Sequence, residues 1–114
     1  KYDLTQTFDS NNGDVSWSTA NDEWALTEPG TYLISTNGYW QDVNSKTVEI
    51  RYNTTAGQGA TSGTLAASQA ADTTARRWDF FTTLTITSTV YLWVHNTSGT
   101  GIVRNWKIQI QRLY

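Results

Sequence analysis

The stretch Thr47–Asn53, TVEIRYN, decides the fold, because its side chains alternate between apolar and polar. Val48, Ile50 and Tyr52 fall on one face, and polar or charged residues fall on the other. Successive side chains of a β-strand point to opposite faces, so this pattern predicts a strand with one buried and one exposed face. The stretch Val90–His95, VYLWVH, has the same period.

The same alternation recurs along the chain and predicts further strands. Strands are predicted at Thr31–Trp40, Thr47–Asn53, Phe80–Ile86, Val90–His95 and Trp106–Ile110, with shorter ones at Tyr2–Phe8, Val15–Trp17 and Glu23–Leu26. Gly38 predicts a bulge or bend. In the phase of their strands, Trp24 and Trp106 fall with Ile and Leu neighbours, so both are predicted to be core residues.

The segment Thr54–Thr74 has a different texture, rich in Ala, Gly, Ser and Thr and without strong alternation. It predicts a long surface connection with one short strand around Thr64–Ser68. Its alanine content leaves a helix at Leu65–Ala75 as the alternative, although no apolar stripe supports one.

Many short strands in 114 residues predict one domain, residues 1–114. The predicted fold is all-β: a two-sheet antiparallel sandwich or a barrel of about 8–10 strands.

Composition limits the function. The net charge is −2, only 16% of residues are charged, and the longest basic run is Arg76-Arg77, which argues against nucleic acid as a partner. No apolar stretch reaches the roughly 20 residues of a membrane-spanning helix, so membrane insertion is not expected. There is no Cys, hence no disulfide or thiolate metal site. Because the chain opens at Lys1 and contains no Met, we expect a processed product or an excised piece.

No motif in the chain predicts catalysis, a cofactor or a metal. His95 is the one histidine and ends a predicted strand, where an exposed imidazole is usually inert. Asp22-Glu23 is the one adjacent carboxylate pair and suits a solvated turn. Oxygen-bearing residues alternate in Asp9–Asp14, as they do in calcium loops, but the spacing lacks the closing Glu of an EF-hand. A polar hairpin turn is the favoured interpretation, and calcium binding stays open.

Several short motifs resemble the globular heads of the tumour-necrosis-factor and complement superfamily. They are Glu23–Leu26 followed by Glu28–Ile34 (EPGTYLI), then Val48–Asn53 (VEIRYN) and Ser88–Val94 (STVYLWV), with the chain ending after Trp106–Leu113. The resemblance implies a ten-strand jelly roll that assembles as a trimer, as at the tips of bacteriophage fibres and spikes. The sequence departs from the family at Thr87-Ser88-Thr89, where Gly-Asp is frequent, and at Thr54–Thr74.

Aromatic residues are the candidate functional groups. Tyr39, Tyr91 and Trp93 fall in the outward phase of their strands, and exposed rings of this size imply a partner. With Tyr114 of the C-terminal segment they are the predicted subunit interface. A ring beside guanidinium and carboxylate groups can stack on a sugar and bind its hydroxyls. The candidate glycan-binding residues are Trp78, Arg76, Arg77, Asp79, Trp17 and Trp40. The alternative for Trp78 is a structural ring that caps the sandwich.

These features predict a non-enzymatic, trimeric head domain of a virion surface or tail fibre, which trimerises the fibre and attaches to a host cell-surface glycan. A virion-surface or extracellular location follows from the same hypothesis. A monomeric carbohydrate-binding module of a secreted enzyme is the first alternative, because the same rings would line a groove. A structural cap that decorates a capsid is the second.

Overall fold

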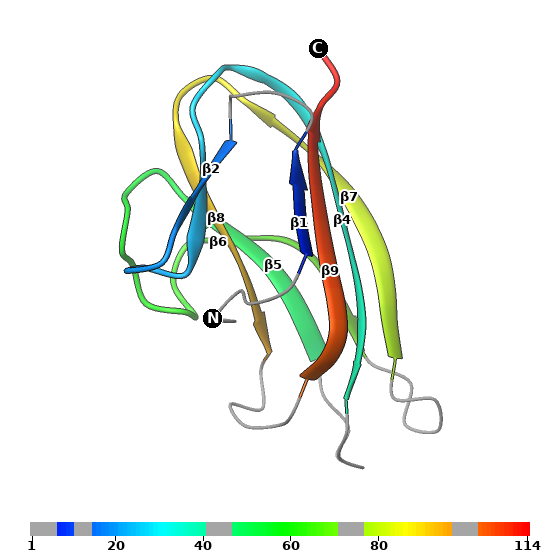
Figure 1. The fold of residues 1–114 in the computed structure, drawn as a ribbon. Coiled ribbons are helices and arrows are strands. Elements are labelled where there is room, and N and C mark those ends of the chain that lie inside the picture. The colour runs from blue at the N-terminus through cyan, green and yellow to red at the C-terminus, as the bar shows by residue number, and fades with distance from the viewer. Residues whose placement is uncertain (1–6, 11–14, 41–46, 71–76, 97–102) are drawn as a thin grey trace.

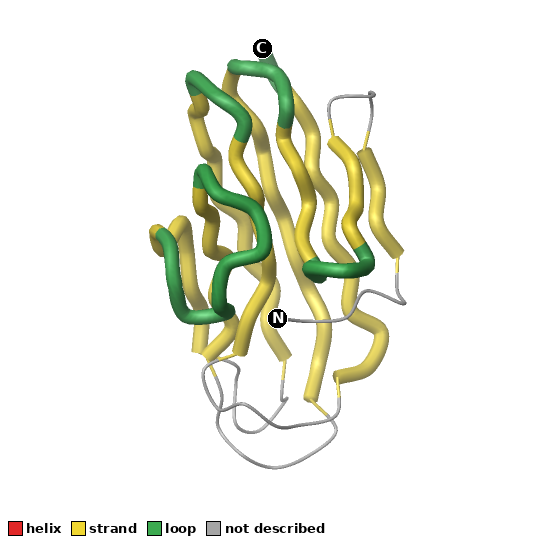
Figure 2. Tube along the Cα trace, turned by 90° about the vertical axis from the view of Figure 1, so that its left-hand side faces the viewer, coloured by secondary structure: helices red, strands yellow, loops and turns green. Residues whose placement is uncertain are grey.

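The structure is a computed structural model that describes residues 7–10, 15–40, 47–70, 77–96 and 103–114. Residues 7–10, 40 and 103–106 are described as backbone only. Strands and the loops between them make up the described chain, as Figure 2 shows. None of the described segments is a helix long and apolar enough to span a membrane.

The described residues form nine strands. They are β1 (Thr7–Ser10), β2 (Val15–Ser18), β3 (Glu23–Leu26), β4 (Gly30–Trp40), β5 (Thr47–Asn53), β6 (Thr64–Ala70), β7 (Arg77–Ile86), β8 (Val90–Asn96) and β9 (Val103–Arg112). A four-stranded sheet has the order β1-β9-β4-β7, and a five-stranded sheet has the order β2-β3-β8-β5-β6. Figure 1 shows the two sheets facing each other as the layers of a sandwich.

The pairing of the strands is nested, which is the signature of a jelly roll. Strand β5 pairs with β6, β4 with β7, β3 with β8 and β1 with β9, so in the order of the chain each of these pairs is enclosed by the one named after it. Consecutive strands therefore lie in different sheets at every step except β2 to β3 and β5 to β6, and the other connections cross from one layer to the other. The all-β, two-sheet jelly-roll prediction is confirmed. One pairing departs from it, because β1 runs parallel to β9 while every other described pair is antiparallel.

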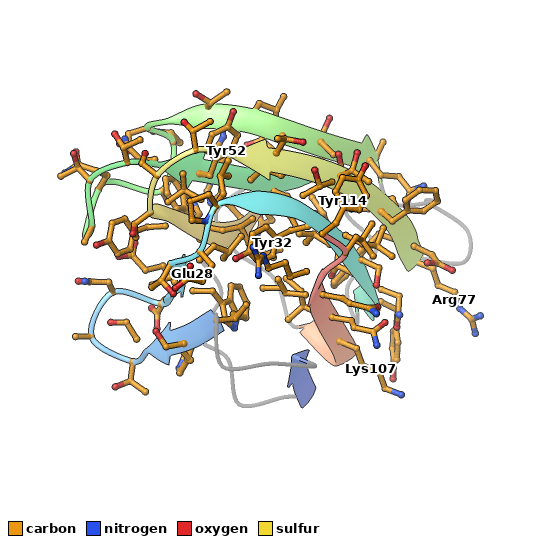
Figure 3. All side chains as sticks on the ribbon, turned by 90° about the horizontal axis from the view of Figure 1, so that it is seen from above. Glu28, Tyr32, Tyr52, Arg77, Lys107 and Tyr114 are labelled. Atoms are coloured by element: carbon orange, nitrogen blue, oxygen red, sulfur yellow. The ribbon has the colours of Figure 1, made fainter. Side chains whose placement is uncertain are left out.

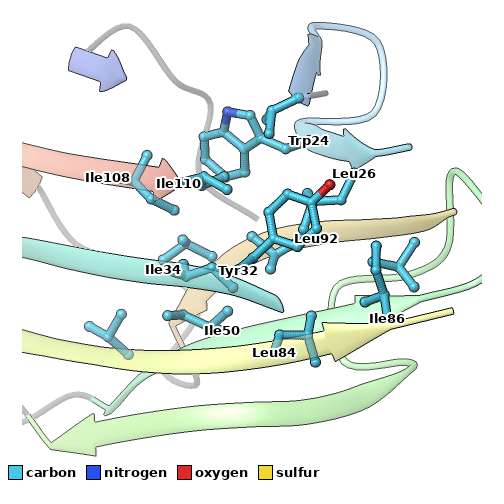
Figure 4. Packing of buried hydrophobic residues seen from close by; sticks show 14 of the residues in the cluster. Trp24, Leu26, Tyr32, Ile34, Ile50, Leu84, Ile86, Leu92, Ile108 and Ile110 are labelled. Carbon is cyan, nitrogen blue, oxygen red and sulfur yellow. The ribbon is translucent and has the colours of Figure 1, made fainter. Parts of the chain in front are cut away.

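The core is made by the inward residues of both sheets. Tyr32, Ile34 and Thr36 of β4 are fully buried, and the hydroxyl of Tyr32 donates a hydrogen bond of 2.7 Å to the carbonyl of Glu28. Ile108 and Ile110 lie beside them on β9. Figure 4 shows the four apolar side chains packed against the opposite sheet, with Tyr32, Ile34, Ile108 and Ile110 on one side and Trp24, Leu26, Ile50 and Leu92 on the other.

Most predicted faces agree with the structure. Val48, Ile50, Val90, Leu92 and Val94 are buried, as the alternation requires. Trp24 is 1% exposed, and a register shift in the β4–β9 ladder between Asn37 and Tyr39 confirms the irregularity predicted at Gly38. The side chain of Trp106 lies outside the described set, so its place in the core stays a prediction.

The alanine-rich segment contains the predicted strand and not the alternative helix. Strand β6 covers Thr64–Ala70 and pairs antiparallel with β5. The loop of residues 54–63 before it, here named the cover loop, lies over the outer face of the five-stranded sheet. On the other side of β6, the Gln69 side-chain oxygen accepts a hydrogen bond of 2.7 Å from the backbone N–H of Asp79. This bond joins the edges of the two sheets.

Candidate functional site

The outer face of the four-stranded sheet is the candidate functional surface. Strand β4 lies between β7 and β9 and presents every second residue to this face, because the intervening residues are buried in the core. The register sets Ser35 beside Phe81 and Gln109, and Asn37 beside Asp79 and Lys107. The outward residues of three strands thus form rows across the sheet.

The rows divide this face into two halves of different chemistry. The uncharged half consists of Thr31, Leu33 and Ser35 on β4, Phe81, Thr83 and Thr85 on β7, and Gln109 and Gln111 on β9. The charged half consists of Asn37 and Tyr39 on β4, Arg77 and Asp79 on β7, and Lys107 on β9. The uncharged half lies toward the C-terminal end of β9, where the Thr31 N–H donates to the Tyr114 carbonyl at 2.7 Å.

Phe81 dominates the uncharged half. Its side chain is 70% exposed, although it lies in the middle of a ten-residue strand. Its partner across the ladder is the small Ser35, so no large neighbour on the same row covers the ring. Phe81 was not among the functional residues predicted from the sequence. The signal was present, because the alternation of Phe80–Ile86 sets Phe80, Leu84 and Ile86 on the inward face, so Phe81 must point outward.

The charged half brings together some of the predicted site residues. Arg77 and Tyr39 are cross-strand neighbours, and Asp79 is the neighbour of Asn37 in the next row. Arg77, Asp79 and Lys107 are exposed, and Tyr39 is half-buried. Arg77 and Lys107 project on the same side of the molecule in Figure 3. Tyr39, predicted at a subunit interface, thus lies among residues predicted to bind glycan.

The prediction that Trp78 offers its ring to a sugar is wrong. Trp78 is 1% exposed, and its Nε1 donates a hydrogen bond of 3.2 Å to the Thr36 hydroxyl within the core. The reason is the period of the strand: Arg77 and Asp79 point outward, so the residue between them points inward. The structural alternative for Trp78 is the correct one.

The prediction that Trp93 lies exposed at an interface is also wrong. Trp93 is on the outer side of the five-stranded sheet, as its phase requires, but its exposed fraction is 0%. The cover loop conceals it: the indole Nε1 donates a hydrogen bond of 2.9 Å to the Ala60 carbonyl. A Cβ added to Gly63 would lie 3.1 Å from the ring. The contact partner of the Trp93 ring is therefore the cover loop of the same chain, whereas the prediction placed it on another subunit.

The remaining candidates are scattered. Tyr91 is half-buried on the five-stranded sheet, so it does not form one row with Tyr39. Trp17 is also on that sheet and faces the interior, where its ring centroid lies 4.6 Å from that of Trp24. Tyr114 is 80% exposed beyond the end of β9. The Trp40 side chain, Arg76 and most of the Asp9–Asp14 loop lie outside the described part of the chain.

Polar groups on the five-stranded sheet hold the cover loop. The guanidinium of Arg51 donates two hydrogen bonds to the carboxylate of Glu49, at 3.0 and 3.2 Å, and a third to the Thr61 carbonyl at 3.3 Å. Glu23, which is 1% exposed, accepts a hydrogen bond of 3.0 Å from the Gly57 N–H. These contacts tie the loop to β3 and β5 and give the cluster a structural role.

His95 lies beside Glu49 in the ladder. Partial burial, which disfavours the charged imidazolium, lowers the pKa of His95 below its ordinary value of 6.5. Over the described ranges, no three His, Cys, Asp or Glu side chains gather as a metal ion would require.

Comparison with known proteins supplies no relative: no family model, curated protein or solved structure matches the chain. The function must therefore be argued from the two outer faces alone.

Proposed function

We propose that this chain is a trimeric head domain of a virion surface, tail fibre or similar extracellular assembly, which attaches to a cell-surface glycan. The uncharged half of the four-stranded sheet is the proposed subunit interface, and the observation that carries the proposal is the 70% exposure of Phe81. A phenylalanine in mid-strand exposes apolar surface that association with another molecule would remove from water.

The chemistry around Phe81 suits a second copy of the same chain. Around a threefold axis, each side chain near the axis meets two copies of itself, so a charge there would be repelled. The uncharged half has no Asp, Glu, Lys or Arg among its residues. Interface centres are depleted of charge and often carry an aromatic side chain, and this half combines uncharged residues with the exposed ring of Phe81. Its Gln, Ser and Thr side chains can form hydrogen bonds between subunits.

A monomeric carbohydrate-binding module is the second candidate. The ring of Phe81 shares one face of the sheet with Gln109 and Gln111, which lie across β4 from it, and this arrangement also suits a sugar chain that stacks and hydrogen-bonds. The two candidates differ in the oligomeric state that they require.

The test is the native mass in solution. A trimer has about three times the 12.8 kDa of one chain. Phe81→Asp should convert the trimer to a folded monomer, because it places three carboxylates in a desolvated contact. Leu65→Asp is the matched control, since Leu65 is 45% exposed on the five-stranded sheet, and its mass should not change.

A wild-type chain that stays monomeric at high concentration would overturn the trimer and favour the monomeric module. A Phe81→Asp variant that keeps the trimeric mass would move the interface away from this half.

A further inference from the structure

We propose that the charged half of the four-stranded sheet binds the acidic group of a saccharide, with Arg77 and Lys107 as its cationic contacts and Tyr39 as its stacking ring. This inference rests on the proposed attachment to a glycan, and it names the class of glycan. It does not depend on the number of subunits.

The first observation is that some cationic side chains have a partner within the fold and others do not. Four Lys or Arg side chains are described, and two of them stabilise the fold. Arg51 pairs with Glu49, and Arg112 donates a hydrogen bond of 2.7 Å to the Pro29 carbonyl. Within the described part of the chain, Arg77 and Lys107 have neither an ion pair nor a side-chain hydrogen bond.

The second observation is that these two cations lie in neighbouring rows of one face. Arg77 is beside Tyr39, and Lys107 is beside Asn37, the next outward residue of β4. Both are exposed and project to the same side of the molecule (Figure 3). The whole chain carries a net charge of −2, so two cations on one small area are not a consequence of a general basic excess.

The other members of the charged half explain why the ligand is a saccharide. Asp79 would repel a simple polyanion, but its carboxylate accepts hydrogen bonds from hydroxyl groups. Asn37 can both donate and accept, and Tyr39 presents a half-buried ring on which the apolar face of a sugar stacks. A ligand with one anionic group and several hydroxyls matches this mixture.

The cations define the anionic group. The planar guanidinium of Arg77 can bind a carboxylate through two parallel hydrogen bonds, and Lys107 adds a point charge. Among the side chains that the structure describes, this half has two cations and one carboxylate, whereas a nucleic acid requires a longer row of phosphate contacts. A carboxylated sugar is therefore favoured over a phosphate polymer.

The position of the charged half is compatible with assembly. Its rows lie toward the Arg77 end of β7, whereas the uncharged half continues toward Ile86. A subunit contact over Phe81 and Thr83 would leave Arg77 at its rim. A multimer would then present several copies of a weak site to one surface, which raises the apparent affinity.

The experiment compares three immobilised probes: sialyllactose, lactose, and mannose 6-phosphate. The wild-type chain should bind sialyllactose at least about tenfold more tightly than lactose, because a charge-assisted hydrogen bond is lost with the neutral sugar. A preference for mannose 6-phosphate would overturn the carboxylate assignment. Heparin is the control polymer, and equal binding to heparin would reduce the site to a non-specific charge patch.

Arg77→Gln, Lys107→Gln and Tyr39→Leu should each weaken sialyllactose binding by about tenfold or more while the native mass and circular dichroism stay unchanged. The matched control is Thr54→Glu in the exposed cover loop, which changes the net charge by the same one unit as Arg77→Gln. This control should bind as the wild type does.

The outcomes separate the two proposals. Binding to lactose as tight as to sialyllactose, or acidic binding that survives all three substitutions, overturns the charged half as the site but keeps the attachment role. Absence of binding to a broad panel of neutral and acidic glycans overturns the attachment role itself.

Discussion

Trp93 on the central strand β8 and Phe81 on the edge strand β7 both point outward, on opposite sides of the sandwich, yet one ring is 0% exposed and the other 70%. Each points away from the core, since the residues on either side of it in sequence are wholly or partly buried. Over Trp93, the chain supplies its own cover through Ala60 and Gly63. Over Phe81, the described chain supplies none. An outward aromatic residue therefore signals a partner, and the fold decides whether that partner is the same chain.

The difference extends to the polar groups around each ring. Beside Trp93, the charges of Glu49 and Arg51 neutralise each other, and Arg51 also donates a hydrogen bond to the cover loop. On the face of Phe81, the charged side chains are confined to the rows of Asn37 and Tyr39. On the outer face of the five-stranded sheet, the polar groups beside Trp93 thus bond to one another and to the cover loop. The outer face of the four-stranded sheet retains groups that can bind another molecule.

The largest effect that this comparison predicts concerns the covered ring. Trp93→Ala should lower the free energy of unfolding by about 3–5 kcal/mol, because it removes a buried indole, leaves a cavity and frees the Ala60 carbonyl. Urea denaturation followed by circular dichroism measures this loss. Phe81→Ala should change stability by less than about 1 kcal/mol when all the chains are compared at a dilution at which they are monomeric. Equal losses from both variants would erase the distinction between the faces.

A smaller effect is expected from the backbone of the cover loop. Gly63 has φ +79°, and an added Cβ would lie 2.4 Å from the Tyr52 carbonyl oxygen. Gly63→Ala should therefore cost more than about 1 kcal/mol and raise the fluorescence quenching of Trp93 by added acrylamide. At Gly59 an added Cβ meets nothing within 4 Å, so Gly59→Ala is the matched control and should be close to neutral. Parity between the two variants would mean that the loop adjusts without strain.

The smallest predicted effect is the dependence of stability on pH through His95. Its pKa is lowered by partial burial, so below pH 6.5 the unfolded chain takes up a proton before the folded chain does. The free energy of unfolding should then fall as the pH drops through this region, and be unaffected by His95 above it. His95→Gln should flatten the profile between about pH 7.5 and about pH 5.5. An unchanged slope in the variant would assign the acid sensitivity to other groups.

The sequence alone determined the strands and the faces of their side chains. Period-two alternation assigned Ile50, Leu92 and Ile34 to the core, because adjacent side chains of a strand cannot share a side. The same rule implied that Phe81 is outward once Phe80 was inward. It also implied that Trp78 points inward if Arg77 and Asp79 point outward. The predicted glycan site ignored this, because it grouped the three residues by their closeness in the sequence.

Only the tertiary structure decided which outward residues meet and which are hidden. Tyr39 and Tyr91 have similar phases but lie on different sheets, and Lys107 reaches the row of Asp79 only through the pairing of β9 with β4. Trp93 is buried by residues 54–63. The sequence of this loop has no alternation of apolar and polar residues from which its packing could be predicted. The physical reason is range: alternation is set by local backbone geometry, whereas strand order and loop cover depend on contacts between residues distant in sequence.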